Sequence, residues 1–220
     1  FDGLHRGHQA LIKRLQKLSR RGGGSVLVTY EPHPDLVLGK SREPFSECFT
    51  YLEKLSLFQQ FDLDAVVFLR FSPELARMTA LRYLKEILLG RLRARTIIIG
   101  YDQCFGRARK GDYAFLKMMS RRYQYKVERI AAVQKKGRII STTEIKRALL
   151  AGEIELANDW LGHPFFLTGT VVRGQQRGSK LGFPTANLEL PETKLIPGAG
   201  VYAAMAEWGQ ARYPCMLNIG

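Results

Sequence analysis

The sequence is poor in cysteine and has no long hydrophobic run. Its three cysteines, Cys48, Cys104 and Cys215, are odd in number and far apart among 220 residues, which argues against a disulfide framework. No apolar stretch approaches the roughly 20 residues that cross a bilayer, and no charged-then-apolar export signal opens the chain. We therefore expect a soluble protein with reduced thiols in the cytoplasm.

Acidic residues are also few. The chain has 34 Lys and Arg against 20 Asp and Glu, a formal net charge of +14. Such a charge suits anionic small molecules, and equally suits nucleic acid or plain solubility. The basic residues gather in 91–95, 107–110 and 121–126 without a nucleic-acid-binding signature, so we interpret these runs as solvated faces. We expect small-molecule partners, and neither nucleic acid nor membrane.

The first eight residues carry the strongest local signal. His5 and His8 flank Gly7 at the start of an amphipathic helix, which glycines 22–24 end. The unpaired amides and the dipole of a helix N-terminus attract anions, and Gly3 and Gly7 let the backbone approach a phosphate oxygen. An imidazole can donate a hydrogen bond to oxygens that gain charge when a phosphoryl centre is attacked. The octapeptide therefore predicts phosphate binding, with His5 and His8 stabilising a transition state.

Other interpretations of these residues stay open. Zinc ligation ranks lower, because no CxxC pair or third nearby ligand completes a zinc set. Two incidental histidines at a helix start are as reasonable as a function for a bare HxGH. Cys104 has no activating His or Asp pattern beside it, so we treat it as a bystander.

Strand-like and helical patterns alternate through the first 133 residues. The expected strands are 25–30, 65–69, 96–99 and 126–133, and the expected helices are 51–61, 81–88 and 113–123. This alternation predicts an α/β fold with a parallel sheet, in which ligands bind beyond the carboxyl ends of the strands. His33, Gly100 and Asp102 fall at such ends. His33 between two prolines suits a strand-exit turn equally well, and an Asp after Gly-Tyr is often a turn residue.

A second candidate phosphate site begins at Ser141. Ser141 and Glu144 form a sequence-level capping box, which explains part of the segment by helix initiation alone. Hydroxyls and cations follow in the first turns: Thr142, Thr143, Lys146 and Arg147. These groups suit a phosphate at the N-terminus of a helix over 142–150, which a second helix over 153–161 follows.

The pattern changes at Gly162-His163-Pro164. The expected domains are 1–162 and 163–220. Alternating segments at 166–172 and 200–204, punctuated by glycine and proline, predict an antiparallel barrel. Within it, residues 180–187 combine glycine with a cation, a hydroxyl and an amide, a set that suits a magnesium-bound phosphate. A glycine-rich hairpin explains the same residues.

Five motifs follow one another along the chain. They are FDGLHRGHQ at 1–9, EPHP at 31–34, GYD with FG and GD at 100–112, ISTTEIK at 140–146 and GSKLGFPTAN at 178–187. In this order they resemble the motifs of the bacterial bifunctional riboflavin kinase/FMN adenylyltransferase (FAD synthetase) family, within the HxGH nucleotidyltransferases. The resemblance implies a Rossmann-like nucleotidyltransferase domain followed by an antiparallel β-barrel kinase domain. It also implies ATP-dependent phosphorylation of riboflavin to FMN, and adenylylation of FMN to FAD with release of pyrophosphate.

The resemblance assigns a role to each motif residue. The implied catalytic residues are His5 and His8. The implied ATP and phosphate ligands are Gly3, Gly7, Gly100, Asp102, Ser141, Thr142, Thr143, Lys146 and Arg147. The implied flavin contacts of the adenylyltransferase are His33, Pro34 and Phe105. The implied kinase ATP site is Gly178, Lys180, Gly182, Thr185 and Asn187, with Mg²⁺ on Thr185 and Asn187. ATP is then the co-substrate, and riboflavin and FMN are the substrates.

The chain departs from the family pattern at its phosphate helix and at its ends. Glu144 stands where the family usually has arginine, and Lys146 replaces a later arginine, which weakens bidentate phosphate binding and makes Arg147 the residue to compensate. The chain begins inside the first motif, without the strand expected before Phe1. It closes before the glutamate expected to deprotonate riboflavin, so we expect an incomplete kinase half and loss of riboflavin phosphorylation.

Two alternatives to this function remain. One is another HxGH adenylyltransferase, acting on a pantetheine or on nicotinamide mononucleotide, against which residues 184–187 speak. The other is a non-catalytic basic module that binds nucleic acid through its Arg and Lys clusters.

Overall fold

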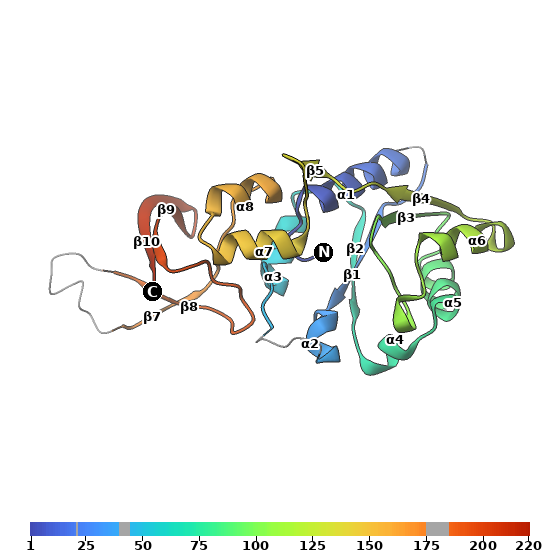
Figure 1. Ribbon diagram of the computed structural model, residues 1–220, viewed down its shortest axis with the longest axis horizontal. Coiled ribbons are helices and arrows are strands. Elements are labelled where there is room, and N and C mark those ends of the chain that lie inside the picture. Colours follow the sequence, from blue (N-terminus) through green and yellow to red (C-terminus); the bar gives the residue numbers. More distant parts are fainter. Residues whose placement is uncertain (21, 40–44, 175–184) are drawn as a thin grey trace.

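Helices and parallel strands alternate up to Ile130, as the sequence predicts, and a short hairpin and two helices follow. The computed structural model in Figure 1 describes residues 1–20, 22–39, 45–174 and 185–220. Its helices there are α1 (Arg6–Ser19), α2 (Pro34–Leu38), α3 (Tyr51–Phe58), α4 (Pro73–Arg77), α5 (Ala80–Tyr83), η1 (Leu84–Arg91), η2 (Arg107–Arg109), α6 (Tyr113–Tyr123), α7 (Thr142–Leu150) and α8 (Ile154–Leu161). The strands are β1 (Val26–Glu31), β2 (Ala65–Arg70), β3 (Thr96–Gly100), β4 (Lys126–Ile130), β5 (Gln134–Lys135) and β6 (Arg138–Ile139).

Strands β1 to β4 pair in parallel. β1 pairs with β2 along its whole length, starting at Val26↔Ala65, and β3 pairs with β4 starting at Thr96↔Lys126. Within the described residues the hydrogen bonds join these four strands as two separate pairs, where the sequence predicts one sheet. A cleft of about 180 Å³ separates β1 from β3 and is lined by side chains of both strands and by Phe1. The fold is therefore mixed α/β with parallel strands.

Two segments differ from the predicted helices and strands. The helix expected over 81–88 exists, but it continues from α5 into η1, a π-helix in which a Cβ on Gly90 would lie 2.9 Å from the Lys85 carbonyl oxygen. The strand expected over 126–133 ends at Ile130, and the β5–β6 hairpin follows. Lys136 and Gly137 turn this hairpin with φ angles of 49° and 74°, the geometry of a two-residue turn that matches strand twist.

The C-terminal part contains antiparallel strands. β7 (Thr170–Val172) pairs with β8 (Asn187–Glu189), and β9 (Gly200–Trp208) pairs with β10 (Ala211–Ile219). In Figure 1 these strands lie at the end of the molecule away from α6. The strands within the described residues form separate pairs and do not close a barrel.

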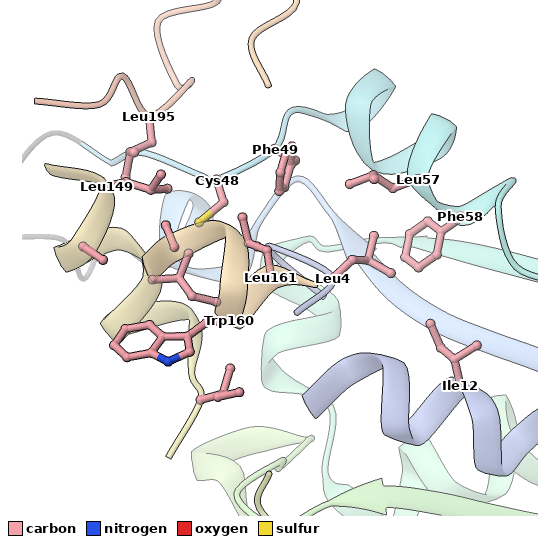
Figure 2. Close-up of a cluster of buried hydrophobic side chains, with 14 of the residues drawn as sticks. Leu4, Ile12, Cys48, Phe49, Leu57, Phe58, Leu149, Trp160, Leu161 and Leu195 are labelled. Carbon is pink, nitrogen blue, oxygen red and sulfur yellow. The ribbon is translucent and has the colours of Figure 1, made fainter. Parts of the chain in front are cut away.

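One buried cluster joins the N-terminal part to the start of the C-terminal part. Leu4 precedes α1, Phe49 precedes α3 and Leu161 ends α8, and all three are fully buried in this cluster. Leu195, which follows β8, enters the same cluster near Leu149 of α7 (Figure 2). A second cluster packs η1 and α6 against β3. None of the described helices combines the length and the apolar character that crossing a membrane requires.

Neighbouring leucines on α7 provide a matched test of this core. Leu149 is fully buried, whereas Leu150 is 59% exposed. We expect Leu149→Ala to lower the free energy of unfolding by about 2–5 kcal/mol, because it removes buried apolar surface and leaves a cavity. We expect Leu150→Ala to change it by less than about 0.5 kcal/mol. Urea unfolding followed by circular dichroism measures both, and equal effects would contradict the assigned core.

Candidate active site at two helix N-termini

A sharp turn before α1 leads His5 into the N-cap position of that helix. Gly3 and Leu4 have φ angles of 92° and 43°, in the left-handed region that strains a leucine. The Nδ1 atom of His5 accepts a hydrogen bond from the Gly7 amide at 3.1 Å, so the neutral ring carries its proton on Nε2. A Cβ on Gly7 would lie 2.9 Å from His5 Cε1. The position of the His5 ring therefore requires a glycine between the two histidines.

The two imidazoles form a stacked, uncharged pair. The ring centroids of His5 and His8 lie 3.8 Å apart at an interplanar angle of 22°. Burial lowers the pKa of His5 to about 4, and burial followed by the neighbouring His5 lowers the pKa of His8 well below its usual value. Both rings are therefore neutral at pH 7. Within the part of the chain that the structure describes, His8 Nδ1 is buried without a hydrogen-bond partner.

Asp2 ties this turn to the start of α7 and to the residues before α3. Its carbonyl oxygen accepts a hydrogen bond from Thr142 Oγ1 at 2.9 Å, and its Oδ2 lies 3.2 Å from Lys146 Nζ. Its Oδ1 accepts the amides of Cys48 at 2.9 Å and Phe49 at 3.3 Å. Asp2 is only 5% exposed, and the ion pair with Lys146 and the two amides compensate part of the cost of burying its charge. Among the described residues its Oδ2 has no hydrogen-bond partner.

The N-termini of α1 and α7 meet, as the two phosphate motifs predict. The carbonyl oxygen of Ile140, just before the α7 cap Ser141, lies 3.9 Å from the Cβ position of Gly7. Ser141 Oγ accepts the Glu144 amide at 3.3 Å. Only this half of the expected capping box forms, because the Glu144 carboxylate pairs with Arg147 instead of returning to the cap. Two positive helix ends thus face one region.

Both cations predicted to bind phosphate have partners in the protein. Lys146 Nζ bridges Asp2 and the carbonyl oxygen of Ser46. Among the described residues, Lys146 Nζ makes one hydrogen bond, to the Ser46 carbonyl oxygen, and an ion pair with Asp2 Oδ2, so the ammonium keeps donors for a phosphate oxygen. The Arg147 side chain is 70% exposed in its pair with Glu144, and a surface pair of this kind is weak enough to exchange for a phosphate. The Thr143 side chain is exposed in the same turn.

His33 and Pro34 begin α2, directly beyond β1. His33 Nδ1 accepts the backbone amide two residues on at 3.2 Å and caps the helix, with Pro34 in its first turn. The His33 ring lies 5.0 Å from the ring of Phe45, and Lys146 Nζ lies 5.5 Å from that same ring. Burial lowers the pKa of His33, and Asp2 partly opposes this effect. His33 therefore shapes the strand exit and also lies close to the histidine turn.

Gly100 ends β3, and Asp102 stands two residues beyond it. The Gly100 amide donates to Gln103 Oε1 at 3.2 Å, and the Asp102 carbonyl oxygen accepts Arg109 Nη2 at 3.2 Å. Asp102 is exposed, yet its charge reaches His5 and opposes the larger effect of burial on the pKa of that ring. Asp102 therefore lies near the histidine pair on the solvent side.

Phe105 has a packing role that the sequence analysis did not assign. Its ring centroid lies 5.0 Å from that of Tyr83 and 6.2 Å from that of Phe115, in the second buried cluster. A Cβ on Gly111 would lie 2.5 Å from the same ring. Since Phe105 is half-buried, contact with a flavin is limited to the part of its ring that remains accessible.

Two of the predicted kinase residues lie in the described part of the chain. Thr185 and Asn187 are exposed at the start of β8. The others lie outside the described residues: Gly178, Lys180 and Gly182. A Cβ on Gly174 would lie 2.0 Å from Asn187 Nδ2, so a larger residue at 174 would displace the Asn187 amide from its present position. Among the described residues no group of three or more His, Cys, Asp or Glu could hold a metal, but hydroxyl and amide oxygens suit Mg²⁺ that is bound largely by phosphate and water.

The role of Asp2 was missed from the sequence. A carboxylate between Phe1 and Gly3 at the start of a phosphate motif suggests ligand binding or solvent exposure, and only the apolar residues around it hint at burial. Its partners Cys48 and Phe49 lie 46 and 47 residues away and belong to no motif. No local pattern could have found this contact.

A histidine pair and two helix N-termini that meet beside parallel strands define an α/β enzyme site suited to nucleotidyl transfer. The FAD synthetase family matches residues 1–144, and the riboflavin kinase family matches residues 161–220. A bifunctional riboflavin kinase/FMN adenylyltransferase of Buchnera aphidicola subsp. Schizaphis graminum is 37% identical over 100% of this chain and 71% of its own length. The Escherichia coli K12 and Bacillus subtilis 168 proteins of the same name are each 34% identical over 100% of this chain and 70% and 69% of theirs.

The chain belongs to the bifunctional riboflavin kinase/FMN adenylyltransferase family, a family of transferases in flavin biosynthesis. A solved structure titled as a macrolide-efflux protein from Streptococcus pneumoniae shares the architecture. Its TM-score is 0.89 at 30% identity, over 100% of this chain and 71% of that one. The word efflux describes that protein only. The two families that match this chain are both named for flavin enzymes.

The low pKa of His5 predicts acid sensitivity of the fold. Between about pH 4 and 6.5 the unfolded chain binds more protons than the folded one, so the stability present above pH 6.5 is lost as the pH falls. We expect the titration of His5 alone to lower the free energy of unfolding by about 2 kcal/mol at pH 5 relative to pH 7. The variant His5→Asn should lack this contribution to the pH dependence. Urea unfolding of both proteins at the two pH values measures it. An unchanged pH dependence in His5→Asn would contradict the buried, neutral ring.

Proposed function

We propose that this chain transfers the AMP moiety of ATP to FMN at the site around His5 and His8, and that its C-terminal part contributes residues to the phosphorylation of riboflavin to FMN. A Rossmann-like domain over 1–162 would carry the first reaction, and a β-barrel domain over 163–220 the second. Family membership supports both reactions. The observation that carries the first is the contact of the histidine turn with α7 through Asp2.

In the adenylyl transfer, a phosphate oxygen of FMN attacks the α-phosphorus of ATP. A bond forms to that oxygen, and the bond between the α-phosphorus and the bridging oxygen breaks to release pyrophosphate. Negative charge grows on the oxygens around the α-phosphorus, where the Nε2–H of His5 and the ring of His8 would donate hydrogen bonds. Because both pKa values are low, the rings act as neutral donors and transfer no proton.

The triphosphate of ATP would lie across the N-termini of α1 and α7. Both helices direct unpaired amides and the positive ends of their dipoles at this region. Thr143 adds an exposed hydroxyl, Lys146 a free donor, and Arg147 a cation that can leave its surface pair. The ammonium of Lys146 is a point charge and cannot bind a phosphate through two parallel hydrogen bonds, as a guanidinium can. Phosphate binding at this helix therefore depends more on the backbone amides. Holding both reactants in line supplies much of the rate.

The residues around the histidines would bind the remainder of the two substrates. His33, Pro34 and the accessible part of Phe105 would border the flavin, since His33 lies close to Asp2. Asp102 at the exit of β3 would accept hydrogen bonds from ribose hydroxyls.

In the kinase reaction, a riboflavin hydroxyl attacks the γ-phosphorus of ATP and ADP leaves. Thr185 and Asn187 offer exposed oxygens that would hold Mg²⁺ beside the phosphates. When bound, Mg²⁺ neutralises the charge of the phosphates. A cytoplasmic location, expected from the scattered cysteines, is part of this proposal.

Formation of FAD tests the proposal directly. We expect the protein to convert FMN and Mg-ATP to FAD in the presence of pyrophosphatase, measured by chromatography with fluorescence detection. His5→Ala and His8→Ala should each lower kcat by about 10²–10³-fold, because each removes a donor directed at developing charge. Met118→Ala, at a position 64% exposed on α6, is the control and should keep the original rate.

Full activity in both histidine variants would remove these residues from the mechanism. Replacing FMN with nicotinamide mononucleotide or phosphopantetheine tests the other HxGH adenylyltransferases, and faster turnover with either would overturn the flavin assignment. A salt-sensitive complex with single-stranded RNA, together with a Tm that does not respond to ATP or FMN, would favour the binding module.

A further inference from the structure

The segment between β8 and β9 belongs to the riboflavin kinase match, but it packs into the N-terminal part. The Glu47 amide donates to the Thr193 carbonyl oxygen at 2.8 Å, and the Leu195 amide donates to the Glu47 carbonyl oxygen at 2.9 Å. Leu195 is 2% exposed and lies near Leu149 and Cys48 in Figure 2. These residues therefore complete the core that the N-terminal helices build.

Lys194, in the middle of this segment, is a fully buried cation. Its side chain is 0% exposed, and its Nζ donates to Glu53 Oε2 at 2.7 Å and to the Cys48 carbonyl oxygen at 2.6 Å. The same Nζ lies 4.5 Å and 4.4 Å from the ring centroids of Phe49 and Phe165. An ion pair this deeply buried contributes little net stability compared with apolar residues of the same volume. Its hydrogen-bond geometry is therefore the feature that a methionine could not replace.

The peptide that Lys194 holds is the one that anchors the catalytic turn. Lys194 binds the carbonyl oxygen of Cys48, while the amides of Cys48 and Phe49 donate to Asp2 Oδ1. Asp2 directly precedes the turn that carries Leu4 at φ 43° and aims His5. A leucine held in that region costs about 1–3 kcal/mol and persists only where its surroundings fix it. The chain of contacts thus runs from the kinase match to the histidines.

We propose that Lys194 is a positioning residue for adenylyl transfer, although it lies in the part of the chain matched by the riboflavin kinase family. By fixing the Cys48–Phe49 peptide it fixes Asp2, and through Asp2 the orientation of His5 and His8. This inference rests on the proposed function of the histidine pair. It implies that the adenylyltransferase site is incomplete without the segment 193–195.

Two measurements on Lys194→Met test this role. The variant keeps the length of the side chain and loses the donor. We expect kcat for FAD formation to fall about tenfold or more at saturating ATP and FMN, because a small displacement of a catalytic group has large effects on rate, with little change in KM. We also expect the pKa of His5, followed by NMR of its ring proton, to rise from about 4 toward 6.5 as the turn loosens.

A control separates positioning from general loss of stability. Leu84→Ala leaves a cavity in the second buried cluster. It should lower Tm while leaving kcat and the His5 titration unchanged. If Lys194→Met lowers Tm in the same way and changes neither readout, the role is only structural and the proposal fails. If Lys194→Met does not fold, Glu53→Gln is the second variant: it keeps the volume of a side chain whose carboxylate accepts hydrogen bonds from Lys194 and from the amides of Thr50 and Thr168, and it removes the negative charge that pairs with Lys194. It should give the same two changes, with a fall of about threefold in rate. An unchanged rate and an unchanged His5 titration in Glu53→Gln would overturn the proposal.

The two readouts also keep this inference separate from the proposed function. If the unsubstituted protein makes no FAD, the adenylyl-transfer proposal fails on its own. The His5 titration needs no reaction and still shows whether Lys194 positions the turn. An unchanged His5 pKa in Lys194→Met would then reject the inference.

Discussion

One buried carboxylate holds the candidate active site together. Asp2 contacts α7 through Lys146 on one side and the Cys48–Phe49 peptide on the other. Removing one partner of a buried charge is expensive, commonly about 3–5 kcal/mol, so these contacts form or fail together. The strained turn at Leu4 and the stacked histidines therefore depend on contacts made far away along the chain.

Different groups in the site attract the triphosphate and stabilise the reaction. A net charge of +14 and two helix N-termini attract the triphosphate at long and short range. The histidines add no charge to this field, because two imidazolium rings stacked at 3.8 Å would repel each other in a buried site. Neutral rings can instead be packed tightly and aimed. Their orientation then matters more than their charge, and the glycine between them and the Asp2 anchor both serve that orientation.

Local sequence patterns predicted the elements well and the site partly. The spacing of apolar residues placed the helices over 113–123 and 142–150 at their observed bounds, because periodicity and caps are local properties. The meeting of α1 with α7 also followed from two phosphate motifs. Two local features were not predicted. The Glu144 carboxylate pairs with Arg147 and does not return to the helix cap. The strand expected over 126–133 ends at Ile130, and a hairpin that turns at Lys136 and Gly137 follows. Lys194 and Glu53 are 141 residues apart, and no periodic pattern records such a pair.

The central claim is that the N-termini of α1 and α7 bind one triphosphate together. The most direct test is a titration with Mg²⁺ and a non-hydrolysable ATP analogue, followed by NMR at the amides of Gly7, His8, Thr142 and Thr143. The account predicts that all four signals shift along one curve with a single Kd, because one ligand contacts both helix ends. Shifts confined to one helix, or two different Kd values, would contradict it.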